Sequence, residues 1–250
     1  MSGLKRILLF CLILLIILPM TSAQDDAPVA ENPELVLVQP QPVSAIAPDG
    51  LVLVGDFYLV NQQAPTVVLF HEIYRLRSNW LPYANLLTTA GFNVLAVDMR
   101  GWGQTGGTID WFTAVDDVAV WMDWLRNAAQ VRPDAISMMG SSMGSSIAIV
   151  GCANDALCQT AIAVSPGYSY YGVDVTEALS LLGERQMFIV YSDRDLYPRR
   201  GVPRMQALVP DNLTIQTYPG RVHGMDLLQA EQATFIPLML QWFQVLGVPQ

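Results

Sequence analysis

The sequence predicts an α/β fold, in which helices cover both faces of a mostly parallel central sheet. The chain has 250 residues, enough for one domain with a sizeable core. From residue 66 onward, short strands that are apolar throughout alternate with helical stretches. This alternation is typical of parallel strands that helices bury on both sides. No internal repeat is evident, so residues 43–250 are expected to form a single domain.

The first 23 residues have the parts of a secretory signal peptide. A basic pair, Lys5 and Arg6, precedes an unbroken apolar run, Ile7–Leu18, and the small residue Ala23 precedes the expected cleavage point. The run is shorter than the about 20 apolar residues that span a bilayer. We therefore expect a secreted or periplasmic protein with residues 24–42 as a flexible, exposed leader. An uncleaved membrane anchor is the alternative.

The charge balance is acidic. The chain carries 22 acidic and 13 basic residues, for a net charge of −9, and cleavage after Ala23 would carry the charge to −11. A surface of this sign disfavours nucleic acid and anionic membranes as partners. The expected partner is a small-molecule ester or acyl compound, and the oligomeric state is left open.

Two cysteines remain beyond the predicted signal peptide. Cys152 and Cys158 are close in sequence, and an exported protein meets an oxidising compartment, so a disulfide between them is expected. The alternative is a pair of buried free thiols. The spacing matches no zinc motif and the chain has only two histidines, so no metal site is expected.

The elements begin with two strands that a turn at Pro48-Asp49-Gly50 separates, and then strands and helices alternate. The expected strands are 43–46, 51–60, 66–70, 93–97, 135–139, 160–164, 187–191 and 213–218. The expected helices are 80–90, 112–128, 145–152, 176–182, 203–209 and 227–246. Ligands of such sheets bind at the carboxyl ends of the strands, and the site is expected there.

The strongest motif is Gly140-Ser141-Ser142-Met143-Gly144, which fits G-x-S-x-G. It lies between an expected strand and an expected helix, as a nucleophile elbow requires. The strained turn would lift the central hydroxyl, that of Ser142, above the sheet, and the helix start would favour negative charge. The motif therefore predicts Ser142 as a nucleophile, with an ordinary small-residue turn as the alternative.

A serine nucleophile needs a base and an acid that orients the base. His223 follows the last strand, where the chain order Ser…Asp…His places the base, although a structural loop histidine would look the same. Asp195 and Asp193 both follow the strand at 187–191. Asp195 is the preferred acid and Asp193 the alternative, since one of the two can simply pair with a nearby arginine.

Acyl transfer also needs two N–H donors for the oxyanion. One is expected from the backbone of Met143, next to the nucleophile. The other is expected from Ile73, in the loop that follows the strand at 66–70. His71, in the same loop, is interpreted as a structural residue that orients the loop.

A second glycine motif, Gly101–Gly106, spells G-x-G-x-x-G. In a dinucleotide-binding fold it should open a helix directly after the first strand. Here Asp98-Met99-Arg100 precede it and a loop continues it, so it is interpreted as a shaped surface loop. No cofactor is predicted from it.

Four stretches together resemble the α/β-hydrolase superfamily, from about Val43 to the end of the chain. They are Phe70-His71-Glu72-Ile73, Asp98-Met99-Arg100-Gly101-Trp102-Gly103, the motif at 140–144, and His223-Gly224. The first is similar to the dienelactone hydrolase branch, which has a cysteine where this chain has Ser142. The resemblance implies an α/β-hydrolase fold, Asp195 as the acid, Glu72 near the nucleophile, and neither a metal nor an organic cofactor.

The segment between Val164 and Met187 has only 22 residues. Members of the superfamily with large lids insert them there, so a minimal lid and an open site are expected. Glu72, Tyr74 and Tyr168 are the expected substrate-binding residues. The candidates for an aromatic pocket are Tyr74, Trp80, Tyr168, Tyr170 and Tyr171. The alternative for each is a place in the core or on the ordinary surface.

These observations predict an exported serine hydrolase that cleaves carboxylic esters through an acyl-enzyme. A peptidase or a thioesterase on the same fold has the same motifs and is the first alternative. A secreted binding protein that kept the scaffold without turnover is the second.

Overall fold

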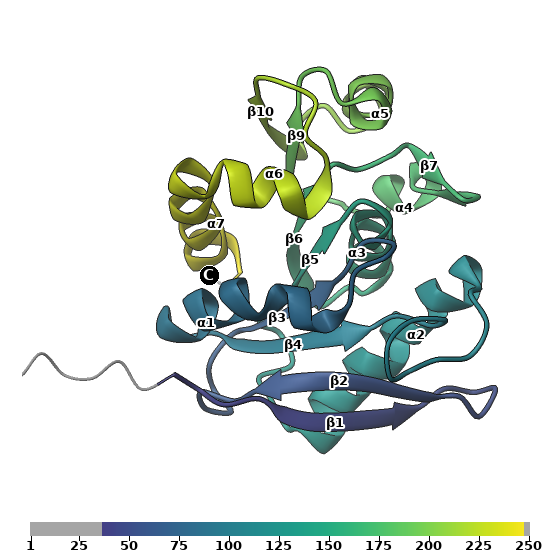
Figure 1. Cartoon of the computed structure of the whole chain (residues 1–250), viewed down its shortest axis with the longest axis vertical. Coiled ribbons are helices and arrows are strands. Elements are labelled where there is room, and N and C mark those ends of the chain that lie inside the picture. Colours follow the sequence, from purple (N-terminus) through teal and green to yellow (C-terminus); the bar gives the residue numbers. More distant parts are fainter. Residues whose placement is uncertain (1–36, 248–250) are drawn as a thin grey trace, which may run out of the picture. The chain divides into compact units, whose positions relative to one another are not determined.

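An eight-stranded sheet runs through the part of the chain that this computed structural model describes, residues 37–247 (Figure 1). The predicted signal peptide, residues 1–23, and the first part of the predicted leader lie outside the described residues. The first strand begins at Gln41, two residues earlier than the predicted start of the domain.

The strand order in the sheet is β1-β2-β4-β3-β5-β6-β9-β10. β2 runs antiparallel to both of its neighbours, and the strands from β4 to β10 are parallel. The strands are β1 (Gln41–Ile46), β2 (Val52–Tyr58), β3 (Thr66–Phe70), β4 (Asn93–Asp98), β5 (Ile136–Ser141), β6 (Cys158–Val164), β9 (Met187–Ser192) and β10 (Leu213–Tyr218). β3, β4 and β5 are buried at every position, which explains why their sequences are apolar without alternation.

Helices cover both faces of the sheet, and each face has its own hydrophobic core (Figure 1). The core on one face contains Leu87 of α1, Leu228 of α6 and Phe243 of α7. The other core contains side chains of α2, α3, α4 and α5. The helices are η1 (Arg77–Trp80, 3-10), α1 (Leu81–Thr89), α2 (Trp111–Asp123), η2 (Trp124–Ala128, π), α3 (Met143–Asn154), α4 (Thr176–Ser180), α5 (Leu196–Leu208), α6 (Gly224–Ala230) and α7 (Gln232–Leu246). No helix within residues 37–247 has the length and apolar character to span a membrane.

The segment between β6 and β9 holds a two-stranded hairpin and one short helix. The hairpin consists of β7 (Ser169–Tyr170) and β8 (Val173–Asp174), and α4 follows it. Tyr171 and Gly172, at the hairpin turn, both have positive φ, which is typical of a tight two-residue hairpin turn. The short helix was expected; the hairpin was not.

Two of the predicted helices differ most from the observed ones. The helix predicted at 203–209 begins at Leu196, as α5, and contains Pro203 in its interior. The predicted helix 227–246 is two helices, because the chain departs from helical geometry at Glu231 (φ −107°). The earlier start of α5 extends that helix to the edge of the site described below.

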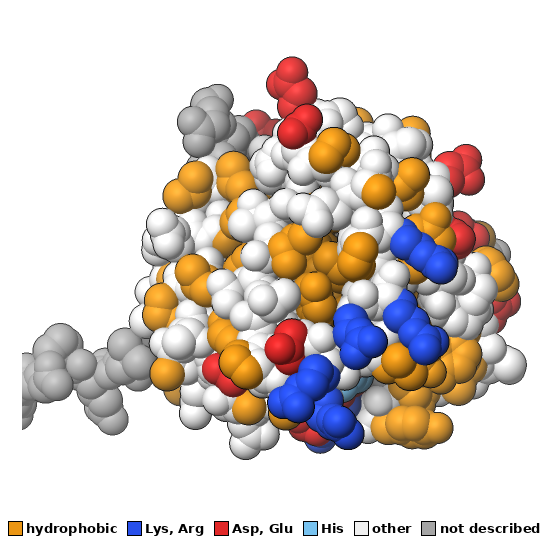
Figure 2. All heavy atoms as spheres, turned by 90° about the horizontal axis from the view of Figure 1, so that it is seen from above, with side chains coloured by type: hydrophobic (Ala, Val, Ile, Leu, Met, Phe, Trp, Pro, Cys, Tyr) orange, Lys and Arg blue, Asp and Glu red, His pale blue; other side chains and the backbone are white. Residues whose placement is uncertain are grey.

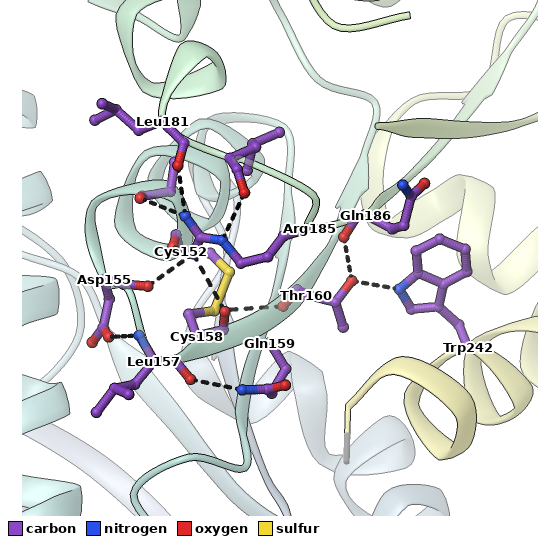
Figure 3. Close-up of a disulfide and its surroundings, with 12 residues drawn as sticks. Cys152, Asp155, Leu157, Cys158, Gln159, Thr160, Leu181, Arg185, Gln186 and Trp242 are labelled. Atoms are coloured by element: carbon purple, nitrogen blue, oxygen red, sulfur yellow. Dashed lines mark hydrogen bonds between the residues drawn. A yellow bond between two sulfur atoms is a disulfide. The ribbon is translucent and has the colours of Figure 1, made fainter. Parts of the chain in front are cut away.

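Cys152 and Cys158 form the predicted disulfide, which ties the end of α3 to the start of β6 (Figure 3). Their Cα atoms are 5.2 Å apart and both side chains are fully buried. The guanidinium of Arg185 donates to the carbonyl oxygens of Cys152, Asp155 and Cys158 at 2.7, 2.8 and 3.3 Å. A charged donor thus satisfies carbonyls at the helix end that the helix itself leaves without partners.

The variant Cys152→Ala/Cys158→Ala should be less stable than the wild type by about 2 kcal/mol, because the disulfide restricts the unfolded chain over a short loop. Chemical denaturation of both proteins measures the difference. A reducing agent should destabilise the wild type to a similar degree and leave the variant unchanged. Equal stability of the two oxidised proteins would mean that the Arg185 contacts hold the loop without the disulfide.

Candidate active site

Ser142 lies in the sharp turn between β5 and α3, with φ at +50°. Its amide donates to the carbonyl of Val164 at 2.8 Å, which fixes the turn against β6. A Cβ on Gly140 would lie 1.9 Å from the carbonyl oxygen of Gly144, and one on Gly144 would lie 2.3 Å from that of Phe70. The close approach of the backbone therefore requires both glycines of the motif.

Ser142, His223 and Asp195 form one hydrogen-bonded chain. Nε2 of His223 lies 2.8 Å from Oγ of Ser142, and Nδ1 lies 2.6 Å from Oδ2 of Asp195. A carboxylate only accepts, so Nδ1 carries the proton and Nε2 is left to accept from the serine hydroxyl. Asp195 directly precedes α5 and His223 directly precedes α6, which places both at the carboxyl ends of strands.

The alternative acid, Asp193, has other partners. Its carboxylate accepts a hydrogen bond from the amide of Gly220 at 2.8 Å and lies 3.7 Å from Arg194. Its side chain is 55% exposed, whereas that of Asp195 is 6% exposed. The structure therefore pairs His223 with Asp195.

The carboxylate of Glu72 joins three segments of the site. It accepts from Oγ of Ser141 at 2.7 Å and from the amide of Met225 at 2.9 Å, and Arg75 lies 3.5 Å away. Glu72 was expected to bind substrate. It lines the cavity at Ser142, and because its Oε2 accepts both hydrogen bonds, it also positions the loops that carry the nucleophile and the histidine.

Ser165, at the end of β6, holds the histidine loop from the other side. Its hydroxyl accepts from the amide of Gly224 at 2.9 Å, and its carbonyl accepts from the hydroxyl of Tyr170 at 3.0 Å. Burial, reinforced by the Asp195 carboxylate, raises the pKa of Tyr170 and keeps it protonated. No motif marks Ser165, and its position after an apolar strand is the only signal in the sequence.

The two amides expected to bind an oxyanion belong to residues beside Ser142. Met143 is the first residue of α3, so its N–H has no acceptor within the helix. Ile73 lies in the loop after β3 and lines the same cavity as Ser142. His71, in that loop, is fully buried; it donates to the carbonyl of Glu72 at 2.8 Å and accepts from the amide of Met99 at 3.0 Å. These bonds connect the loops after β3 and β4.

The cavity at Ser142 has a volume of about 400 Å³ and is walled by tyrosines. Three of their rings lie edge-on or tilted against a second aromatic ring. The ring centroids are 5.6 Å apart for Tyr74 and Trp102, 5.7 Å for Tyr171 and Trp111, and 5.4 Å for Tyr170 and Tyr197. The lining residues are Glu72, Ile73, Tyr74, Ser142, Ser169, Tyr170, Tyr171, Tyr197 and His223. No arginine is among them.

Two of the predicted pocket residues lie elsewhere. Tyr168 does not line the cavity, because its ring faces the guanidinium of Arg204, 5.6 Å from the ring centroid. Trp80 is fully buried and packs against Tyr83 in the core. Tyr197 takes part instead, and it was missed because it belongs to the unpredicted first turn of α5.

The G-x-G-x-x-G stretch forms a loop around the carboxylate of Asp98. That carboxylate accepts from the amides of Arg77 at 3.0 Å and Gln104 at 2.9 Å. A Cβ on Gly103 would lie 2.1 Å from Oδ2 of Asp98. The glycines thus allow the loop to close on this buried acid, as the interpretation of a shaped loop expected.

The sheet order, the helices on both faces and the turn between β5 and α3 are those of the α/β-hydrolase superfamily. Within it, the chain belongs to the serine aminopeptidase S33 family, whose model matches residues 61–188. An esterase from Pyrococcus furiosus has a similar structure, with a TM-score of 0.74 over 86% of this chain and 93% of that chain, at 18% identity. At this level of identity the similarity concerns the fold.

Two curated relatives are similar in sequence over part of their length. The uncharacterized protein YfhR of Salmonella typhimurium is 27% identical over 180 residues, covering 57% of this chain and 60% of the relative. The thiohydrolase aneE of Aspergillus aculeatus is 27% identical over 129 residues, covering 50% of this chain and 41% of the relative. The chain thus spans less than two thirds of either relative.

The variant Glu72→Gln should be less stable than the wild type by about 2 kcal/mol, since an amide replaces a charged acceptor of two hydrogen bonds. It should also lower kcat, because Ser141 and Met225 lose their common anchor. Denaturation and ester kinetics measure the two effects. Glu184→Gln, at an exposed side chain, is the matched control and should change neither. Wild-type behaviour of Glu72→Gln would remove the positioning role.

His71 should make the fold sensitive to acid. Burial lowers its pKa below the ordinary value of 6.5. The unfolded chain therefore takes up a proton first as the pH falls below 6.5, and stability is lost down to the lower pKa of the folded state. Between pH 7 and 5 the wild type should lose more stability than His71→Gln, by up to about 1.4 kcal/mol per pH unit. Parallel pH profiles of the two proteins would contradict this.

Proposed function

We propose that the protein is an exported serine hydrolase that cleaves carboxylic esters through an acyl-enzyme. The observation that carries the proposal is the hydrogen-bonded chain from Oγ of Ser142 through His223 to Asp195. In this arrangement the hydroxyl, a weak nucleophile by itself, has a base within hydrogen-bond distance, and the base has an oriented tautomer.

In the proposed reaction, Oγ of Ser142 attacks the ester carbonyl while Nε2 of His223 takes the hydroxyl proton. The carboxylate of Asp195 stabilises the imidazolium that forms. The amides of Ile73 and Met143 would stabilise the oxyanion, helped by the amino end of α3. His223 then protonates the departing alcohol, and water hydrolyses the acyl-enzyme along the same proton path.

Several observations support esters as the bond type. In the segment where larger lids would stand, the residues that line the cavity are Ser169, Tyr170 and Tyr171 of the β7–β8 hairpin, which leaves room for a small ester. A structural neighbour is named an esterase, and a relative is named a thiohydrolase. A panel of oxygen esters, thioesters and aminoacyl amides with the same acyl group would rank the three bond types.

Export is part of the proposal. Its support is the composition of residues 1–23 together with the disulfide between Cys152 and Cys158. Disulfides of this kind persist in oxidising compartments and are rare in the cytosol. The amino-terminal sequence of the protein recovered from its natural compartment tests both export and cleavage after Ala23.

The variant Ser142→Ala should lose at least about a thousandfold in kcat on a short-chain chromogenic ester, with an unchanged melting temperature. It should also lose labelling by a fluorophosphonate probe. Ser146→Ala, in the next turn of α3, is the matched control, because its buried hydroxyl has no hydrogen-bond partner among the described residues. Full turnover by Ser142→Ala would refute the nucleophile, and an unlabelled wild type would favour a binding protein.

A further inference from the structure

The arginines of the described residues fall into two groups. Those before residue 186 are all held by carboxylates or by backbone carbonyls. The remaining five lie between residues 194 and 221, and we call them the arginine rim: Arg194, Arg199, Arg200, Arg204 and Arg221. Basic side chains gather on one part of the face shown in Figure 2, beside hydrophobic side chains.

The rim is exposed and largely unneutralised. All five side chains are exposed, and within residues 37–247 no ion pair involves Arg199, Arg200 or Arg221. The only carboxylates between residues 194 and 221 are those of Asp195, which His223 occupies, and Asp211. In a chain of net charge −9, the rim is a local region of positive charge.

The fold gains nothing from this placement. Arg199 and Arg200 lie near the amino end of α5, where the helix dipole disfavours positive charge. α5 contains no acidic residue that could form a pair with them along the helix. Arginines in this position, without an acidic partner on the helix, have donors free for an anionic ligand.

The rim borders the candidate active site. Arg194 directly precedes Asp195, and Arg221 lies two residues before His223. Tyr197 lines the cavity, and Arg199 follows it within the first turn of α5. The cavity itself is lined by tyrosines and by the carboxylate of Glu72, with no arginine among its lining residues, so a compartment without arginine lies next to a cationic edge.

We propose that the substrate is an ester whose alcohol part carries an anionic group, a carboxylate, sulfate or phosphate, bound by the arginine rim, while its uncharged acyl part enters the tyrosine cavity. Guanidinium groups suit these anions because their planar donors match two oxygens at once. The inference rests on the proposed ester hydrolysis. The negative net charge of the chain does not oppose this, since salt screens distant charges and leaves local ones to act.

The test uses the full chain and three aryl acetates that differ in the charge of the leaving group: 4-acetoxybenzenesulfonate, phenyl acetate and 4-(trimethylammonio)phenyl acetate. The measured quantity is kcat/KM for the anionic ester divided by kcat/KM for the neutral ester. Comparing this ratio between variants cancels the intrinsic reactivity of each ester. Arg199→Gln/Arg200→Gln should lower the ratio about fivefold, and rising salt should lower it in the wild type.

The matched control is Gln62→Glu/Gln63→Glu, which changes the net charge by the same amount at two exposed positions before the amino end of β3. It should leave the ratio unchanged. The melting temperature of Arg199→Gln/Arg200→Gln should equal or exceed that of the wild type, so misfolding would not account for the result. An unchanged ratio in that variant, or an equal fall in the control, would overturn the inference alone. If the wild type hydrolysed none of the three esters, both this inference and the proposed function would be overturned.

Discussion

The candidate site depends on the carboxylate of Glu72, which is largely shielded from solvent and accepts hydrogen bonds from protein donors. Glu72 follows β3, yet its Oε2 accepts both from Ser141 at the end of β5 and from Met225 at the start of α6. A charge in this position is stable only when its acceptors are filled, so the three segments have to meet there. The same demand explains Gly224, where a Cβ would lie 1.9 Å from Oε2 of Glu72 and where φ is +61°.

The parallel sheet supplies the frame on which these contacts form. Ser142 and Asp195 are far apart in sequence, but β5, β6 and β9 are adjacent in the sheet and end at the same edge. Ser165, at the end of the middle strand, accepts the hydrogen bond from Gly224 and so positions the residue next to His223. The hydrogen-bonded chain of the site therefore reflects strand order, since each partner needs only a short loop to reach the edge.

Much of this was predictable because it rests on strong local patterns. Apolar strands without alternation predicted a sheet buried on both faces, and the G-x-S-x-G turn predicted Ser142 because close backbone approach needs glycine at Gly140 and Gly144. The partners of Glu72 were not predictable, because the sequence is the same whether the carboxylate binds a ligand or donors of its own chain. Tyr197 was not predicted as a pocket residue, and it lies in the first turn of α5, which begins at Leu196 and not at the predicted Pro203.

The position of that start connects the two halves of the candidate site. The start of α5 carries Asp195 at the cap position, where it pairs with His223, then Tyr197, which lines the cavity, and the exposed Arg199 and Arg200. One short element thus carries the acid, a residue that lines the cavity, and two arginines. The arginines favour an anionic ligand but do not stabilise the helix. Removing Arg199 and Arg200 relieves the unfavourable interaction with the helix dipole but also removes two of the five positive charges of the rim. A helix under selection for stability alone would carry acidic residues in this turn, as the dipole favours, and its positive charges here are the reason to assign the rim to substrate.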